Sequence, residues 1–165
     1  MIVNGWQIFA HPLFIDQLAK LTIAVERARQ KDPERYRATA NAKLLAALNR
    51  LVRETIPADP SRPEYRQGDT LGTHRKHWFR VKFGSQRFRL FFRYQNAGKV
   101  IVLAWVNDED SLRTYGSKSD AYSVFRAMLE RDSPPDDWRA LMIEAAAAKA
   151  RLEKALGAAR DATPS

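Results

Sequence analysis

The sequence predicts an α+β fold in which helices precede and follow a small sheet. Apolar residues recur at helical spacing before residue 57 and after residue 119. Between them, residues 78–107 form three strand-like segments joined by short turns. The composition agrees, because 165 residues of which 45% are hydrophobic can bury one full core. We therefore expect a single domain with, at most, a short appendage.

Two helices are expected before the sheet, after a short strand over Trp6–Ala10. The first helix covers about residues 13–30. Asp32 and Pro33 predict the start of the second helix, as its N-cap and first helical residue, and Pro57 predicts its end. The apolar stripes are Phe14, Leu18, Leu21 and Val25 in the first helix, and Leu44, Leu45, Leu48, Leu51 and Val52 in the second.

A long connection and three strands follow. Residues 57–77 contain three prolines and two glycines, and loops of this length in compact domains are often functional. The predicted strands cover about residues 78–83, 87–95 and 99–107. Gly84 and Ser85 fit a two-residue hairpin, because a type II′ turn places glycine first.

The last part of the chain predicts further helices. Ser119 or Asp120 can cap the first of them, whose stripe is Tyr122, Phe125, Met128 and Leu129. An alanine-rich helix over residues 136–157 follows and ends at Gly157. We expect a main domain over residues 1–135, this helix, and a disordered tail over residues 158–165.

Positive charge is concentrated in the predicted sheet. The chain carries a formal net charge of +9, and no Asp or Glu occurs between Thr70 and Asn107. The bases of this window are Arg75, Lys76, Arg80, Lys82, Arg87, Arg89, Arg93 and Lys99. A localised basic face of this kind is typical of proteins that bind phosphate backbones.

The alternation of the two hairpin strands places their Arg and Lys side chains on one face of the sheet. Alternation assigns Phe79, Val81, Phe83, Phe88, Leu90, Phe92 and Tyr94 to the core, and Trp78, Arg80, Lys82, Arg87, Arg89, Phe91 and Arg93 to the opposite face. The two-residue turn puts Lys82 opposite Arg87 and Arg80 opposite Arg89, and like charges that face each other are destabilising. A polyanion would supply the missing negative charge, although the same face could simply oppose aggregation. Trp78 and Phe91 would stack on unpaired bases, which favours RNA or single strands.

Such a face could also cut RNA without a metal. A base takes the proton of the 2′-hydroxyl, cations stabilise the phosphate, and an acid protonates the leaving oxygen. Tyr94, Tyr115, His74 and His77 are the nearby proton-handling residues, although Tyr94 has core parity and the histidines could equally contact phosphate or face solvent. Asp108, Glu109 and Asp110 are consecutive and therefore do not converge on one ion by themselves, so no metal or cofactor is expected. His11 is expected to be structural.

Other classes of protein are disfavoured. The chain has no cysteine, which excludes disulfides, thiolate metal sites and a cysteine nucleophile. The longest strongly apolar run, Val100–Val106, is far shorter than the roughly 20 residues of a membrane helix. No convincing secretory signal opens the chain, so we expect a soluble, cytoplasmic protein.

The segments RVKFG, RFRLFFRY and KVIVLAWVNDEDSLRTYGSKSDAYSVFRAML closely resemble the YhaV toxins of bacterial toxin–antitoxin systems, relatives of the RelE and ParE toxins. VNGWQIFAHPLF and ATANAKLLAAL resemble them too, so the likeness covers about residues 3–139. It implies a RelE-like fold, with two N-terminal helices packed on a twisted antiparallel sheet of about four strands and helices after it. It also implies a metal-independent endoribonuclease that cleaves mRNA, often on the ribosome, and inhibits growth. A PrlF-type, AbrB-like antitoxin would neutralise it, and the complex would repress its own operon.

The resemblance suggests roles for individual residues. Arg89 and Arg93 would contact the scissile phosphate, with Arg113 and Lys118 as further phosphate contacts and Tyr115 as the acid–base group. It places Arg80, Lys82 and Arg87 along the RNA backbone, and Asp120 is expected to cap a helix. The charge and hairpin pattern, and not the resemblance, adds Trp78, Phe91, Arg75 and Lys76 as expected RNA contacts. A ParE-like inhibitor of a protein such as gyrase, or a non-catalytic RNA-binding module, are the alternatives.

The antitoxin could be held in two ways. Its acidic segments could mask the basic sheet, or it could use the stripe of the last helix (Trp138, Leu141 and Leu152). That helix could instead pack on the core.

Overall fold

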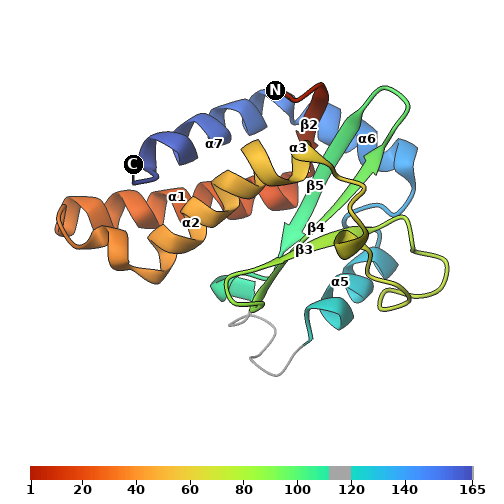
Figure 1. The fold of residues 1–165 in the computed structure, drawn as a ribbon, viewed down its shortest axis with the longest axis horizontal. Coiled ribbons are helices and arrows are strands. Elements are labelled where there is room, and N and C mark those ends of the chain that lie inside the picture. Colours follow the sequence, from red (N-terminus) through yellow and green to blue (C-terminus); the bar gives the residue numbers. More distant parts are fainter. Residues whose placement is uncertain (112–119, 165) are drawn as a thin grey trace.

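The structure is a computed structural model and describes residues 1–111 and 120–164. Its sheet has five strands in the order β1-β2-β5-β4-β3 (Figure 1). They are β1 (Ile2–Val3), β2 (Trp6–Ala10), β3 (Phe79–Phe83), β4 (Phe88–Gln95) and β5 (Val100–Val106). The predicted strands are confirmed, but the sheet has five strands where about four were expected. The expectation of an antiparallel sheet is wrong in part, because β2 runs parallel to β5. The continuous apolar run of β5 suits this central place, where strands flank it on both sides.

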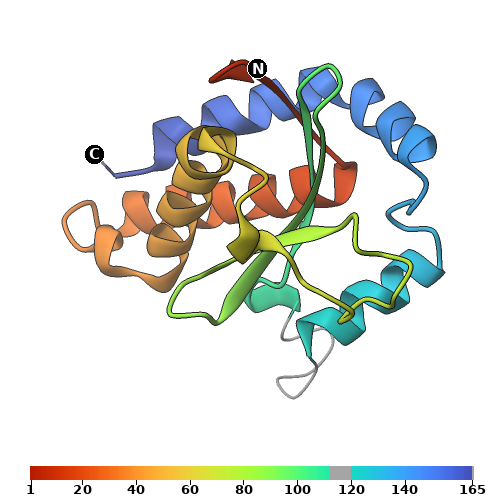
Figure 2. The same ribbon diagram turned by 45° about the vertical axis from the view of Figure 1, so that its right-hand side comes forward.

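Helices cover both faces of the sheet. They are α1 (Pro12–Lys31), α2 (Ala40–Arg50), α3 (Ile56–Ala58), α5 (Ala121–Glu130), α6 (Trp138–Ala147) and α7 (Lys149–Ala162), and a π-helical segment over Leu51–Thr55 joins α2 to α3. Helices α1, α2 and α7 lie on one face and α5 lies on the other, as Figure 2 shows with the sheet between them. None of the helices in the described ranges is long and apolar enough to span a membrane.

The second helix begins later than Asp32 and Pro33 predict. Asp32 ends α1, because its backbone N–H donates to the carbonyl of Ala28. Thr39 is the actual N-cap of α2, and its hydroxyl accepts the N–H of Ala42 at 3.2 Å. A turn and a short 3₁₀ helix over Tyr36–Ala38 fill the interval, so the Asp–Pro pair marks a helix end.

The alanine-rich C-terminal segment forms two helices. They meet at Ala148, and α7 continues through Gly157 to Ala162, where a disordered tail was expected. Leu152 and Leu156 are buried in the same core as α1, which explains why this segment is ordered despite its small side chains. The core on the side of α1, α2 and α7 is the first core, and the core on the side of α5 is the second core. Trp138 and Leu141 pack in the second core, so the stripe that could have received a partner is already covered.

The β3–β4 hairpin has a four-residue loop, Gly84–Arg87. Phe83 pairs with Phe88, and their rings lie 5.5 Å apart between centroids. Gly84 has φ +60°, and a Cβ there would lie 2.6 Å from the Phe88 ring, so the loop requires glycine. Lys82 therefore faces Arg89, and Arg80 faces Phe91. The expected pairing was wrong by two residues, which leaves every side chain on its predicted face.

The second face of the sheet is buried, against expectation. Trp78 and Phe91 are both 0% exposed, so neither can stack on a nucleic-acid base. Phe91 stacks on Phe125 of α5 at 4.4 Å, and Trp78 meets the same ring edge-on at 5.0 Å. The reason is that β5 is apolar on both faces, and the apolar stripe of α5 covers the second one.

We expect Phe91→Ala to lower the free energy of unfolding by about 3–5 kcal/mol, since it removes a fully buried aromatic ring. Urea denaturation measures this. Ile143→Ala is the control, because Ile143 is 63% exposed and its truncation changes stability by less than about 0.5 kcal/mol. If Phe91→Ala keeps full stability but binds RNA more weakly, the prediction is wrong, and Phe91 is an exposed residue that stacks on RNA bases.

Candidate active site

Two arginines from neighbouring strands meet one tyrosine hydroxyl. The Nε atoms of Arg80 on β3 and Arg89 on β4 donate to the Tyr122 hydroxyl at 2.9 and 3.1 Å. The Arg89 guanidinium carbon also lies 5.3 Å from the centre of the Tyr122 ring. Because the oxygen accepts two hydrogen bonds, its own proton is free to be exchanged with a ligand.

Backbone groups hold these three side chains in place. Arg80 donates from Nη1 to the carbonyl of Glu64 at 2.7 Å, and Arg89 donates from Nη1 to that of Gln86 at 3.0 Å. Tyr122 lies in the first turn of α5, where the carboxylate of Asp120 accepts its N–H at 3.2 Å. The expectation that Asp120 caps a helix is confirmed. The guanidinium planes are thus oriented before any ligand binds.

The electrostatic environment favours the tyrosinate. Partial burial opposes ionisation of Tyr122, but the hydrogen bonds and charges of Arg80 and Arg89 outweigh it and lower the pKa below its ordinary value. A phenol of lowered pKa exchanges protons more readily near neutral pH. Lys82, opposite Arg89, is exposed and has no hydrogen-bond or ion-pair partner among the described residues. The group can therefore bind a phosphate and move a proton.

A second group of cations surrounds Asp136, in the link between α5 and α6. One carboxylate oxygen accepts from His77 Nε2 at 2.8 Å and from Trp78 Nε1 at 2.7 Å, and Arg75 lies 3.8 Å from the other. Arg93 donates to the Asp136 carbonyl at 2.6 Å. Burial opposes ionisation of Asp136, but His77, Trp78 and Arg75 together lower its pKa.

Arg93 is thereby separated from Arg89. Its guanidinium carbon lies 5.5 and 5.0 Å from the rings of Trp78 and Trp138, and burial lowers its pKa against the opposing charge of Asp136. Between the two arginines on β4, Phe91 is covered by α5. The structure therefore does not bring Arg93 and Arg89 to one phosphate-sized group, and the role expected for Arg93 stays a prediction.

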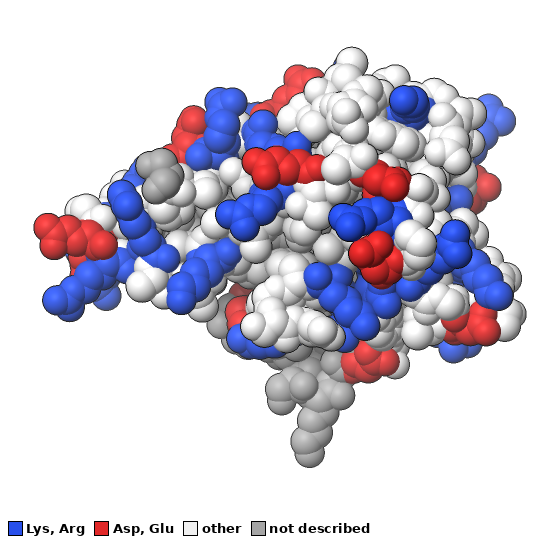
Figure 3. All heavy atoms as spheres, viewed as in Figure 1, with Lys and Arg blue, Asp and Glu red and all other residues white. Residues whose placement is uncertain are grey.

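The other bases of the basic window are distributed over the surface. Arg87 forms an ion pair with Glu109 at 2.9 Å, and Lys76 lies 3.5 Å from Asp69. Lys and Arg side chains lie among Asp and Glu side chains on the face seen in Figure 3. His74 is exposed in the loop before β3. The sheet is therefore not the unbroken basic surface that its sequence suggested.

Tyr94 and His11 lie in structural positions. The Tyr94 ring packs 4.8 Å from Phe79 and 6.0 Å from Trp6, against the first core, as its parity predicted. His11 caps α1: its Nδ1 accepts the N–H of Leu13 at 3.2 Å, so Nε2 carries the proton and donates to Glu144 at 2.8 Å.

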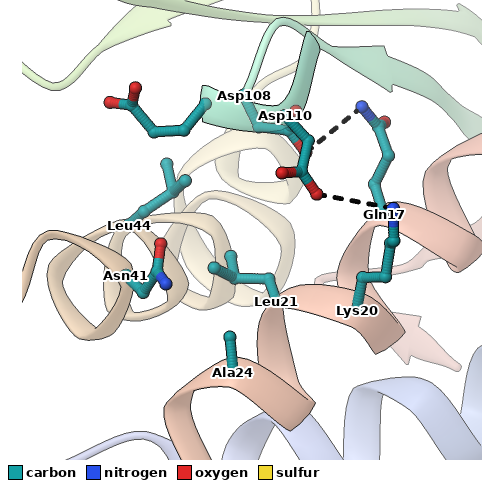
Figure 4. Close-up of a pocket in the computed structure, with 9 residues that line it drawn as sticks. Gln17, Lys20, Leu21, Ala24, Asn41, Leu44, Asp108 and Asp110 are labelled. Carbon is teal, nitrogen blue, oxygen red and sulfur yellow. Dashed lines mark hydrogen bonds and ion pairs between the residues drawn. The ribbon is translucent and has the colours of Figure 1, made fainter. Parts of the chain in front are cut away.

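The three consecutive acids line a pocket of about 220 Å³ between α1 and α2, shown in Figure 4. Asp108 accepts the N–H of Ser111 at 2.8 Å, and Asp110 lies 3.5 Å from Lys20. The part of the chain that the structure describes contains no group of three side chains placed to share a metal ion. Asp108 thus caps the helical turn that begins at Glu109, shortly after β5.

Sequence reasoning missed Tyr122 as a functional residue, because its helical spacing assigned it to the buried stripe of α5. The feature that could have identified it is its position in the first turn of a helix that follows a pair of strands rich in Arg and Lys. Arg113, Tyr115 and Lys118 lie outside the described residues, and their roles stay predictions.

In this α+β fold, two arginines hold a tyrosine beside an exposed lysine. Such a group of side chains suits a protein that acts on phosphodiesters. A family model described as "Toxin with endonuclease activity, of toxin-antitoxin system" matches residues 8–146. The chain belongs to this family, the YhaV toxins.

Curated relatives are similar over most of their length. Toxin YhaV of Escherichia coli O6:H1 and Ribonuclease toxin YhaV of Escherichia coli K12 are each 50% identical to this chain over 143 residues. The match covers 86% of this chain and 93% of each relative. No solved structure matches significantly.

We expect Asp136→Asn to flatten the dependence of stability on pH in the acid range. The pKa of Asp136 is lowered in the folded state, so its contribution is present above about pH 4 and is lost as the pH falls through the lowered pKa. Urea denaturation between pH 7 and the acid limit of the fold measures this. Asp161→Asn, on the exposed end of α7, is the control. Parallel profiles for Asp136→Asn and the unsubstituted protein would contradict the prediction.

Proposed function

We propose that this toxin is a metal-independent endoribonuclease that cleaves mRNA and arrests growth. The observation that carries the proposal is the convergence of Arg80 and Arg89 on the Tyr122 hydroxyl, next to the exposed Lys82. Family membership supports the endonuclease activity, and the name of the K12 relative supports RNA as the substrate. The five-stranded sheet with helices on both faces would then be a variant of the RelE-like fold.

The proposed reaction is an attack of the 2′-hydroxyl on the adjacent phosphate. Tyr122, as the phenolate, takes the 2′-hydroxyl proton while the 2′-oxygen bonds to phosphorus. Arg89 and Lys82 neutralise the charge that grows on the phosphate oxygens, which is the work that a metal would otherwise do. The bond to the 5′-oxygen breaks, and that oxygen takes a proton from Tyr115 or from the protonated Tyr122. The products are a 2′,3′-cyclic phosphate and a 5′-hydroxyl.

The regulation expected from the family likeness belongs to the same proposal. A PrlF-type, AbrB-like antitoxin would cover the exposed cations, because Lys82 and Arg87 can attract acidic segments. The complex would repress its own operon through the DNA-binding part of the antitoxin. An mRNA substrate, cut on the ribosome, would place the toxin in the cytoplasm.

We expect Tyr122→Phe and Arg89→Ala each to slow single-turnover RNA cleavage by about 10²- to 10⁴-fold, because each removes a proton-transfer or charge-stabilising group. The folded state should persist in both variants, as far-UV circular dichroism can verify. Arg126→Ala is the matched control, since Arg126 is an exposed arginine of the same helix, paired with Glu130. Undiminished cleavage by both variants would remove this cluster from the reaction.

Expression without antitoxin should produce new RNA 5′ ends, and purified toxin should still cut RNA in EDTA. Sequencing of 5′-hydroxyl ends measures the first, and breaks in register with codons would support cleavage on the ribosome. Growth arrest without broken RNA would favour a protein target such as gyrase. RNA that is bound but never cut would favour a binding module.

A further inference from the structure

Asn107 directly follows the last residue of β5, and its side chain continues the hydrogen bonding to the neighbouring strand beyond the end of β5. The side chain is buried, with 6% exposure, and faces β4. Its Oδ1 accepts the N–H of Arg89 at 2.6 Å, and its Nδ2 donates to the carbonyl of Arg87 at 3.2 Å. The backbone N–H of Asn107 donates to the carbonyl of Arg89 at 3.4 Å. One residue thus binds the β4 backbone on both sides of Phe88.

The pattern of the ladder makes this contact important for Arg89. Along an antiparallel strand, successive residues direct their backbone N–H and C=O groups to opposite neighbours. Phe88 pairs with Phe83 of β3, whereas both backbone groups of Arg89 point to the β5 side. The strand pairing of β4 with β5 has its last pair at Leu90 and Val106, so it stops one residue short of Arg89. Asn107 therefore binds both the backbone N–H and the backbone carbonyl of Arg89.

Gln17 of α1 fixes the residue before Asn107 in a similar way. Its Nε2 donates to the carbonyl of Val106 at 2.6 Å, and its Oε1 accepts the N–H of Val106 at 3.1 Å. The pairing of β2 with β5 ends earlier, at Ala10 and Leu103, so this amide takes the place of the missing strand neighbour. Figure 4 shows the Gln17 side chain directed from α1 toward the turn that carries Asp108.

We propose that Asn107 and Gln17 are positioning residues for the reaction, which hold the end of β4 so that the Arg89 guanidinium lies on the Tyr122 hydroxyl. The part of Arg89 in cleavage rests on the proposed function. The geometry does not rest on it. The Asn107 amide binds the backbone of Arg87 and Arg89, and the Gln17 amide binds the backbone of Val106 and lies 3.5 Å from Asp108. Removing the Asn107 amide frees the end of β4 directly, and removing the Gln17 amide loosens the end of β5 that carries Asn107. Neither substitution changes a charge, and in both the backbone from which the Arg89 side chain extends is no longer held in place.

Asn107→Ala and Gln17→Met test this, since both substitutions are neutral. The first readout is the titration of Tyr122, followed by NMR of ring-labelled tyrosine and assigned by comparison with Tyr122→Phe. We expect the pKa of Tyr122 to rise toward its ordinary value, about 10, as Arg89 moves away. Single-turnover cleavage should slow by about 10- to 100-fold, because misplacement by about 1 Å can cost that much. The Kd for a non-cleavable 2′-deoxy oligonucleotide should stay within about threefold, since no charge is lost.

Asn49→Ala is the matched control for loss of a partly buried amide. Asn49 accepts from Arg53 at 3.2 Å and donates to Thr163 at 3.2 Å, on the other face of the sheet. It should lower stability and leave both the Tyr122 titration and the cleavage rate unchanged.

An unchanged Tyr122 pKa in folded Asn107→Ala would overturn the inference. Gln17→Met decides the question alone if Asn107→Ala does not fold. The titration also separates the two proposals. Full cleavage by Tyr122→Phe would reject the proposed mechanism, whereas a raised Tyr122 pKa in Asn107→Ala would still establish that the amides position Arg89.

Discussion

The packing of α5 on the second face of the sheet is the contact on which the candidate site depends. Phe125 lies against Phe91, Trp78 and Trp105, with ring centroids 4.4, 5.0 and 5.8 Å away. Burial of four aromatic rings in one cluster fixes the axis of the helix relative to β4. Tyr122 lies one helical turn before Phe125, so the same contact delivers its hydroxyl to the two arginines. The site is thus a product of core packing.

The crowding of like charges on the hairpin is relieved in two different ways. The buried Phe91 separates the arginines of β4 into two groups. At one end, a carboxylate offsets Arg75 and His77, and that group ties the loop before β3 to the link between α5 and α6. At the other end, Arg80 and Arg89 share one tyrosine hydroxyl, and no carboxylate among the described residues pairs with either of them. Attraction for a phosphate is therefore concentrated at one end of the sheet.

Local patterns predicted the strands, their faces and most helices, because alternation and helical spacing are properties of short segments. They assigned Trp78 and Phe91 to the correct face but could not show that a helix beginning 30 residues after Phe91 would cover it. The parallel pairing of β2 with β5 is equally non-local. Tyr122 was missed for the same reason: its partners lie 33 and 42 residues away, on two strands. Asn107 carries no pattern at all, since a single amide after a strand is common.

The contact between α1 and α7 has a consequence for the biosynthesis of the protein. Leu152, Leu156 and Ala159 complete the first core against α1, and Glu153 lies 3.7 Å from the amino group of Met1. A ribosome makes α7 after every other described helix and strand, so α1 must wait for a partner that emerges last. A chain whose α7 is still being synthesised has therefore not yet completed its first core, although every strand of the sheet and the aromatic cluster around α5 have already been made.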